Sequence, residues 1–180
     1  MKELELKDIC GYLPYDLKIM DTEREAVFPF LGYEIDTTLT KILLYDEETD
    51  WWNLSNFKPI LRPLSDLYKP IIHNGKEIFP IVELAKRGNG CAVLDNHWML
   101  VNNGAETQRN RNGFYRFEYN EALSFFENYW RGTNNGVSYR KVKYQYQLFD
   151  YLHELKIDYR GLIDAGLAIS VHDLEFNPYN

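Results

Sequence analysis

Four residues near the middle of the sequence have side chains that could do chemistry together. Cys91 lies four residues before the stretch Asp95-Asn96-His97, so a thiol, a carboxylate and an imidazole could converge on a metal ion or form a Cys–His nucleophilic couple. Asp95-Asn96 is equally typical of a turn, and a cysteine outside a CxxC spacing is more often part of a core. The turn interpretation is favoured, and we expect neither a stoichiometric zinc ion nor any other cofactor.

The remaining reactive residue types do not fall at catalytic spacings. The 11 glycines never form a GxGxxG or GxxxxGK[ST] phosphate loop, GxSxG is absent, and no histidine has a second histidine three or four residues away. Asp150 and Glu154 are four residues apart and could act as paired acids, but a solvated helix face explains them as well. We therefore assign no catalytic residue and no metal ligand, and we do not expect an enzyme.

Two adjacent tryptophans are the first candidate for binding a partner. Trp51 and Trp52 follow the acidic run DEETD at residues 46–50. In an extended backbone, neighbouring side chains point to opposite faces, so one of the two rings should be exposed. Tryptophan is enriched at protein interfaces. The sequence therefore favours Trp51 and Trp52 as residues that bind another protein.

A basic and aromatic segment, SYRKVKYQY at residues 138–146, is the alternative. Its cations could contact a phosphate backbone while a tyrosine stacks on a base, and the polar loop TQRNRN at 107–112 could add two arginines. The overall net charge of −7 and the pI near 5.1 oppose nucleic-acid binding. The candidate contacts are Arg109, Arg111, Tyr139, Arg140, Lys141 and Lys143.

Composition is typical of a folded chain with a sizeable core. The 180 residues are 45% hydrophobic and 16% aromatic, which predicts a single domain over 1–180 with a possible insert or lobe at about 73–144. The first ten residues lack the pattern of a signal peptide, and no apolar run is long enough to span a membrane. Cys10 and Cys91 are distant in sequence, so reduced thiols and a cytoplasmic location are expected.

The pattern of apolar residues predicts an α+β fold, with an antiparallel sheet or partly open barrel from the first two-thirds packed against two or three C-terminal helices. Strands are expected at 17–20, 26–35 and 38–45 as a meander, with Pro29 at an edge or bulge. Residues 58–70 carry three prolines and predict an extended crossing segment that is neither a central strand nor a helix. Asn74-Gly75 and Asn103-Gly104 predict tight hairpin turns, and strands are expected at 91–94, 97–101 and 114–119.

Four helical segments are expected. Pro80 would start a helix that Gly88 closes, and Asn120 would cap a helix over 121–131. Val142, Tyr146, Phe149, Leu152 and Leu155 recur at helical spacing and predict the buried face of a helix over 142–155. A second, shorter helix is expected from Asp158, which would accept its free backbone donors, to Gly166 in a left-handed conformation.

Three stretches carry a resemblance to a known group of proteins. They are ELKDICGYLPYDLK at 5–18, KPILRPLSDL at 58–67 and FDYLHELKIDYRGLIDAGLAIS at 149–170. They resemble short proteins of unknown function encoded by phages, prophages and mobile elements of Bacteroides-type gut bacteria. The resemblance covers roughly a quarter of the chain. It implies an accessory protein that acts in a bacterial cytoplasm, and it brings no activity, cofactor or catalytic residue.

Two functions remain open on these grounds. The first is a non-enzymatic protein-binding module that modulates or inhibits a host factor, with an unidentified host protein as its partner and no membrane. The alternative is a nucleic-acid-binding accessory protein that uses residues 138–146. The acidic first part of the chain and the missing catalytic constellation favour the first.

Overall fold

The chain forms two compact units in a computed structural model. The first unit comprises Met1–Leu64 and Leu152–Asn180, and the second comprises Ser65–Tyr151. The range of the second unit encloses the possible lobe at 73–144, while the assignment of 1–180 to one domain stays a prediction. The structure describes residues 3–35, 40–46, 48–88, 92–94, 97–99, 113–132 and 136–180.

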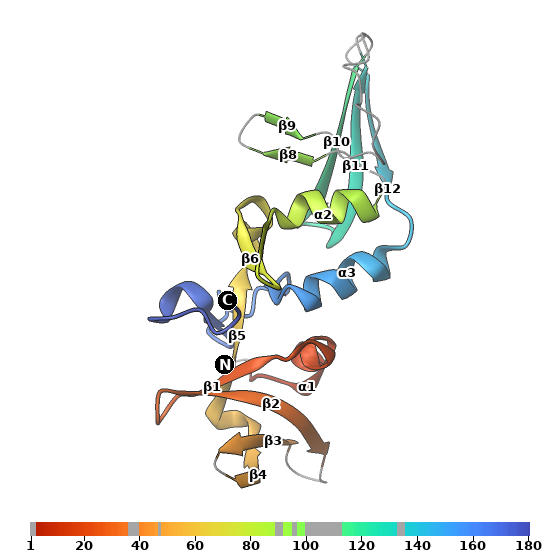
Figure 1. The fold of residues 1–180 in the computed structure, drawn as a ribbon. Helices are drawn as coiled ribbons and strands as arrows, with labels where there is room; N and C mark the ends of the chain where they lie inside the picture. The colour runs from red at the N-terminus through yellow and green to blue at the C-terminus, as the bar shows by residue number, and fades with distance from the viewer. Residues whose placement is uncertain are drawn as a thin grey trace. The chain divides into compact units, whose positions relative to one another are not determined.

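The first unit contains a mixed, open sheet of seven strands in the order β13-β5-β1-β2-β3-β4, with β14 also paired to β5. Figure 1 labels β1 to β5 of this sheet. With the helices, the sheet confirms the predicted α+β class. The strands are β1 (Lys18–Asp21), β2 (Ala26–Ile35), β3 (Thr40–Asp46), β4 (Glu48–Asn53), β5 (Phe57–Pro63), β13 (Ile157–Asp158) and β14 (Ile169–Ser170).

The predicted antiparallel meander is confirmed by β1, β2 and β3, and β4 extends it. Successive side chains in these strands point alternately to the core and to solvent. Ile19 in β1 and Ile42 in β3 are fully buried, while their neighbours are half-exposed. The register of β2 shifts between Phe30 and Gly32, directly after Pro29. The predicted bulge is therefore present, and the proline stands beside it.

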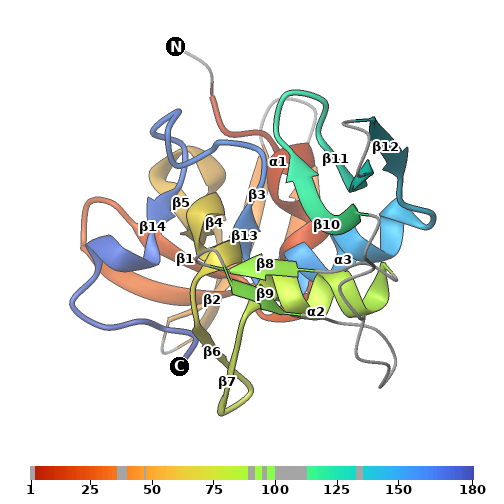
Figure 2. The ribbon, with the colours of Figure 1, turned by 90° about the horizontal axis from the view of Figure 1, so that it is seen from above.

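Residues 58–63 are extended as predicted, but the exclusion of a central strand is wrong, because β5 is an interior strand. It pairs antiparallel with β1 and parallel with β13 and β14, and in the sheet order it lies between β13 and β1. These four strands are labelled in Figure 2. Pro59 is the last position of the β1–β5 register, and Pro63 is the last residue of β5. Each proline therefore stands at the end of a ladder, where a missing backbone N–H is least costly. A 3-10 helix follows at Leu64–Tyr68.

The N-terminal and C-terminal segments complete the core of the first unit. Helix α1 (Leu6–Ile9) leads into a 3-10 helix at Cys10–Tyr15, and short 3-10 helices occupy Leu54–Asn56 and Val171–Asp173. Ile9, Tyr12, Ile42 and Leu61 are fully buried in this core, together with Leu162 from the C-terminal segment.

The expected helix over 158–166 is wrong, since Asp158 ends β13 and turns follow it at residues 159–160 and 162–166. Its two end signals nevertheless work as predicted. Asp158 accepts hydrogen bonds from the backbone N–H groups of Arg160, Leu162 and Ile163, and Gly166 is left-handed, with φ of 72°. The carboxylate thus organises a compact turn, which places Leu162 in the core.

The second unit begins with the hairpin β6 (Ile71–His73) and β7 (Lys76–Ile78), labelled in Figure 2. Asn74 and Gly75 have φ of 51° and 71°, as the predicted tight turn requires. Helix α2 (Pro80–Arg87) starts at Pro80 and ends at Gly88, also as predicted. Strands β8 (Ala92–Leu94) and β9 (His97–Met99) pair antiparallel, whereas the predicted turn at 103–104 lies outside the described residues.

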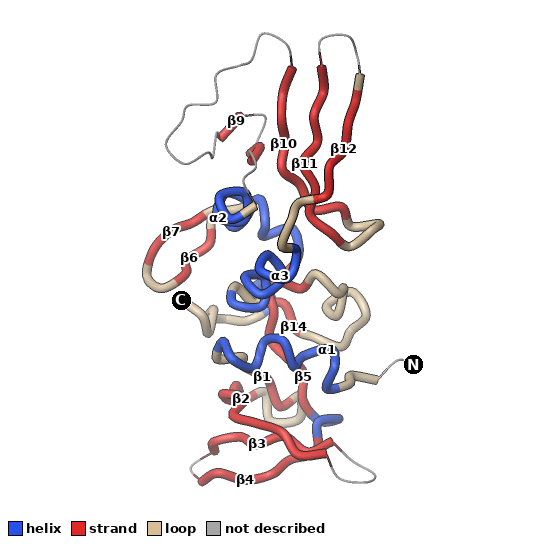
Figure 3. Tube along the Cα trace, turned by 90° about the vertical axis from the view of Figure 1, so that its right-hand side faces the viewer, coloured by secondary structure: helices blue, strands red, loops and turns tan. Residues whose placement is uncertain are grey.

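A three-stranded antiparallel sheet follows, formed by β10 (Gly113–Asn120), β11 (Phe125–Gly132) and β12 (Val137–Lys141) (Figure 3). The predicted helix over 121–131 is wrong. Asn120 accepts a hydrogen bond from the backbone N–H of Leu123, which closes a turn instead of capping a helix. The aromatic run after it has high strand propensity, and pairing with β10 and β12 decides its conformation.

Helix α3 (Gln145–Glu154) confirms the predicted C-terminal helix, and its predicted buried face is correct in part. Tyr146 is 68% exposed and Phe149 is half-buried. Val142, Leu152 and Leu155 are buried as predicted, and so are Leu148 and Tyr151. Truncating Phe149 should therefore cost less than the 3–5 kcal/mol typical of a fully buried ring.

Candidate functional site

The two tryptophans of β4 separate as the strand geometry requires. Trp52 pairs with Ile42, which is fully buried, so its ring lies on the core face of the sheet. It packs edge-on against Phe57 at 6.2 Å between ring centroids, and the guanidinium of Arg24 lies 4.5 Å from its centroid. Trp51 lies on the opposite face and is 43% exposed. The two residues therefore have different roles, which the sequence could not assign.

Trp51 belongs to an apolar surface on the outer face of the meander, which we call the Trp51 face. Leu43 pairs with both Trp51 and Gly32, so the three positions share this face. A side chain at Gly32 would lie 3.9 Å from Cβ of Leu43, and its absence leaves the surface shallow beside the tryptophan. Leu31, at the register shift, is 52% exposed. The Trp51 face thus comprises Gly32, Leu43 and Trp51, and the exposed Leu31 is next to Gly32 in the chain.

The strand that carries Trp51 is the last in the sheet order. Among the described residues, no strand pairs with its far edge. Natural edges are commonly protected by proline, lysine or a bulge, and β4 contains no proline and no lysine. The hairpin segment 46–50 instead carries four acidic residues and no basic one. Two copies of this edge would repel each other, while a basic partner would be attracted.

The basic and aromatic segment lies partly on β12 and partly at the start of α3. Tyr139 is 59% exposed, and Lys141 and Lys143 are exposed as well. Lys141 Nζ lies 4.9 Å from the ring centroid of Phe125. Arg140 belongs to β12, whereas Arg109 and Arg111 lie outside the described residues, so the structure does not test their expected contribution.

The remaining chemical candidates are described only in part. Cys91, Asp95 and Asn96 lie outside the described residues, and His97 belongs to β9. Asp150 on α3 is exposed and Glu154 is half-buried. Among the residues that the structure describes, no three His, Cys, Asp or Glu side chains cluster as metal ligands.

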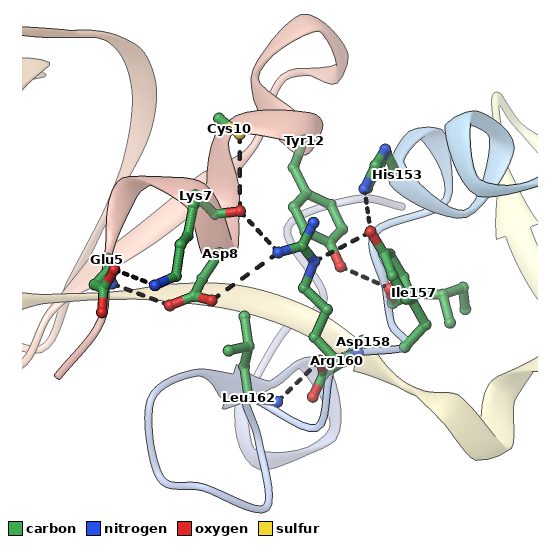
Figure 4. Close-up of polar contacts among 11 residues, drawn as sticks. Glu5, Lys7, Asp8, Cys10, Tyr12, His153, Ile157, Asp158, Arg160 and Leu162 are labelled. Carbon is green, nitrogen blue, oxygen red and sulfur yellow. Dashed lines mark hydrogen bonds and ion pairs between the residues drawn. The ribbon is translucent and has the colours of Figure 1, made fainter. Parts of the chain in front are cut away.

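A polar network in the first unit has no counterpart in the sequence-based predictions (Figure 4). His153 Nε2 lies 2.8 Å from the hydroxyl of Tyr159, which also accepts a hydrogen bond from Arg160 Nε at 3.1 Å. Arg160 Nη1 donates to the backbone oxygen of Lys7 at 2.8 Å and lies 4.0 Å from Asp8 Oδ1. Because the Tyr159 oxygen already accepts from Arg160, its proton is available to an unprotonated Nε2 of His153.

This network joins the N-terminal helix to the C-terminal segment. Tyr12 donates a hydrogen bond of 2.9 Å to the backbone oxygen of Ile157, and its ring meets His153 edge-on at 4.7 Å. A Cβ at Gly11 would collide with the His153 ring, so only glycine allows this approach. A Tyr–His pair has the groups for proton transfer. These contacts, however, attach residues 7–12 to residues 153–160, and we assign them that structural role.

A second polar contact fixes the end of the chain to β5. The Tyr179 hydroxyl donates to the backbone oxygen of Ile60 at 2.8 Å and accepts from the backbone N–H of Lys18 at 3.0 Å. Lys156 Nζ lies 5.0 Å from its ring centroid and the Arg62 guanidinium 6.0 Å. Burial raises the pKa of the Tyr179 phenol above its ordinary value. Burial, together with the nearby charge of Arg62, lowers the pKa of the Lys156 ammonium.

The raised pKa of Tyr179 predicts a specific loss of stability in alkali. Below about pH 10 the phenol is protonated in both the folded and the unfolded chain. Above it, the unfolded chain releases the proton first, so the free energy of unfolding falls as pH rises. Tyr179→Phe should be less stable by about 1–3 kcal/mol at pH 7, because two backbone groups lose their partner. Urea unfolding at pH 8 and pH 11 should show this difference shrinking. Tyr144→Phe, at an exposed position, is the control, and an unchanged difference would contradict the assignment.

No helix in the described parts of the chain is long and apolar enough to cross a membrane. Comparisons of the chain with protein-family models, with curated proteins and with solved structures find no match. Functional conclusions must therefore rest on the two exposed surfaces described above, the Trp51 face and the segment at 138–146.

Proposed function

We propose that this chain is a non-enzymatic protein-binding module that modulates or inhibits a host factor through the Trp51 face. The observation that carries the proposal is the outward placement of Trp51 beside Leu43 and the open position at Gly32. Large aromatic rings next to a shallow apolar surface are the usual anchors of protein interfaces. An accessory role in the cytoplasm of a bacterial host is part of the same proposal and rests on the resemblance of the three quoted stretches.

The partner that best fits this surface has a basic segment next to an apolar pocket. The acidic run at 46–50 precedes Trp51, so complementary charge would orient the partner along β4. The backbone groups at the far edge of β4 could also pair with an extended segment of the partner. Because the partner is basic, its affinity should fall as the salt concentration rises. Because Trp51 is the anchor, its affinity should also fall when the Trp51 side chain is truncated.

The adjacent tryptophans provide a matched test. Trp51→Ala should weaken capture of a host protein about 30-fold, which corresponds to roughly 2 kcal/mol for a central anchor, and should leave the melting temperature nearly unchanged. Trp52→Ala should lower the stability by about 2 kcal/mol or more, because its ring packs on the core. The measurement is quantitative pull-down from host lysate beside thermal unfolding, at low and high salt.

Phe176→Ala is the control for this experiment, since Phe176 is 62% exposed in the same unit but lies outside the Trp51 face. It should change neither capture nor stability. Equal capture by wild type and Trp51→Ala would reject the Trp51 face as the binding surface. A large loss of stability in Trp51→Ala would reject its outward placement.

A further inference from the structure

Three exposed tyrosines lie close in sequence at the junction of β12 and α3. Tyr139, Tyr144 and Tyr146 are 59%, 65% and 68% exposed, although partly buried tyrosine is the common case. The rings of Tyr144 and Tyr146 stand perpendicular, with centroids 6.4 Å apart. Lys141 and Lys143 are exposed between the first ring and the other two. We call these five residues the tyrosine–lysine surface.

The backbone beneath this surface is firmly attached to the sheet. The side chain of Gln145 accepts a hydrogen bond from the backbone N–H of Phe126 at 2.8 Å and donates to the backbone oxygens of Phe126 and Val142 at 2.6 and 2.9 Å. Val142 is buried, and its N–H also donates to the oxygen of Phe126. Because residues 142 and 145 are held inward, the flanking tyrosines are held outward.

Tyr144 has an unusual backbone conformation at this junction. Its φ is 60°, a left-handed value that is rare for a bulky side chain and costs of order 1–3 kcal/mol. Such conformations are concentrated at binding sites, where the surrounding structure maintains them. Here the Gln145 hydrogen bonds maintain it. The backbone that carries the rings is therefore already ordered before a ligand stacks on them.

The local charge selects the class of ligand. Residues 138–147 contain three basic residues and no acidic one, and Glu127, opposite Lys141, is buried and accepts a hydrogen bond from Asn120. The exposed acidic residues Glu121 and Asp150 lie outside this segment. Cations that alternate with exposed rings match an anionic backbone that carries flat, unstacked bases.

We propose that the tyrosine–lysine surface binds single-stranded nucleic acid, as a function separate from the Trp51 face. Bases stack on Tyr144 and Tyr146, and Lys141 and Lys143 contact phosphates. A duplex is a poorer ligand, since its bases are already stacked on one another and cannot reach the rings. The net charge of −7 weakens the interaction, so binding is best measured at low salt.

The test uses fluorescence anisotropy of the full chain with fluorescein-labelled dT15, rU15 and a 15-base-pair DNA duplex. Single strands should bind more tightly than the duplex. Tyr144→Ala and Tyr146→Ala should each weaken single-strand binding by roughly tenfold to hundredfold. The double change Lys141→Ala with Lys143→Ala should flatten the log–log salt dependence by about 1.4, or about 0.7 for each phosphate that is no longer neutralised by a lysine.

Two controls make the outcome specific. Lys76→Ala removes an exposed cation elsewhere in the second unit, and Phe176→Ala removes an exposed ring; both should bind like wild type. Circular dichroism of each variant checks that the fold is intact. The proposal is overturned by absence of saturable binding at about 50 mM salt, by tighter binding to the duplex, or by equal losses in the control variants. None of these results bears on the Trp51 face.

Discussion

Phe126→Ala should lower the free energy of unfolding by about 3–5 kcal/mol, the range for a fully buried aromatic ring. Phe126 is 0% exposed, and its ring stacks on Phe117 at 5.3 Å between centroids. It also meets Tyr119 at 5.0 Å and Phe149 at 5.8 Å. Removing it would leave a cavity at the centre of the second unit, between the three-stranded sheet and α3, and urea unfolding at neutral pH is the measurement.

Phe125→Ala is the matched control, one residue away. In a strand the two side chains lie on opposite faces, and Phe125 is half-buried beneath Lys141. Phe125→Ala should lower the free energy of unfolding by about half as much as Phe126→Ala, or less. Equal losses in the two variants, or a larger loss for Phe125→Ala, would argue against the strand and in favour of a helix over 121–131.

Asp158→Ala should destabilise the chain by about 3 kcal/mol, because a buried carboxylate holds three backbone donors. Its oxygens lie 3.3 Å from Arg160 N, 3.0 Å from Leu162 N and 2.7 Å from Ile163 N. Without the carboxylate these N–H groups lose their acceptor, and the turn no longer holds Leu162 in the core. Denaturant unfolding gives the size of the loss.

Two variants calibrate this expectation. Asp158→Asn should lose less stability than Asp158→Ala. Its amide keeps one acceptor oxygen, facing either Leu162 or Ile163, and replaces the other oxygen by an NH2 donor. Asp164→Ala, at an exposed position in the same segment, should stay within about 0.5 kcal/mol of wild type. Equal stability of Asp158→Ala and wild type would show that the turn does not depend on the carboxylate.

Local signals predicted the elements whose conformation is set by a few neighbouring residues. Asn74-Gly75 forms its tight turn and Pro80 starts α2, because positive φ angles and a missing N–H are properties of those residues themselves. Segments rich in β-branched and aromatic residues predicted the meander, and the alternation of side chains in an extended backbone predicted the separation of Trp51 from Trp52. It could not predict which ring is exposed, since that depends on which face covers the core.

The incorrect predictions have a common cause in long-range pairing. Phe57–Pro63 became an interior strand because β13 and β14, about a hundred residues later, pair with it. Residues 125–132 became a strand because partners on both sides outweighed a helical spacing of apolar residues. In residues 158–166, Asp158 and Gly166 gave correct local signals without a helix between them.

The same limitation applies to the sites. The network of Tyr12, His153, Tyr159 and Arg160 joins residues more than a hundred positions apart, so no spacing rule could reveal it. It does connect two of the stretches that carry the resemblance, 5–18 and 149–170. The remaining stretch, 58–67, contains most of β5. The stretch 149–170 contains β13 and β14, which both pair with β5. These stretches therefore build the framework of the first unit, whereas the Trp51 face lies outside them.

Site-specific photo-crosslinking tests the central claim, the binding of a protein by the Trp51 face, most directly. A benzophenone amino acid is placed at position 51 in one sample and at position 176 in another, both at exposed aromatic positions of the first unit. The account predicts a discrete host protein crosslinked from position 51, competed by unlabelled wild type and not by Trp51→Ala, and none from position 176. Equal crosslinking from both positions, or none from position 51, would contradict it.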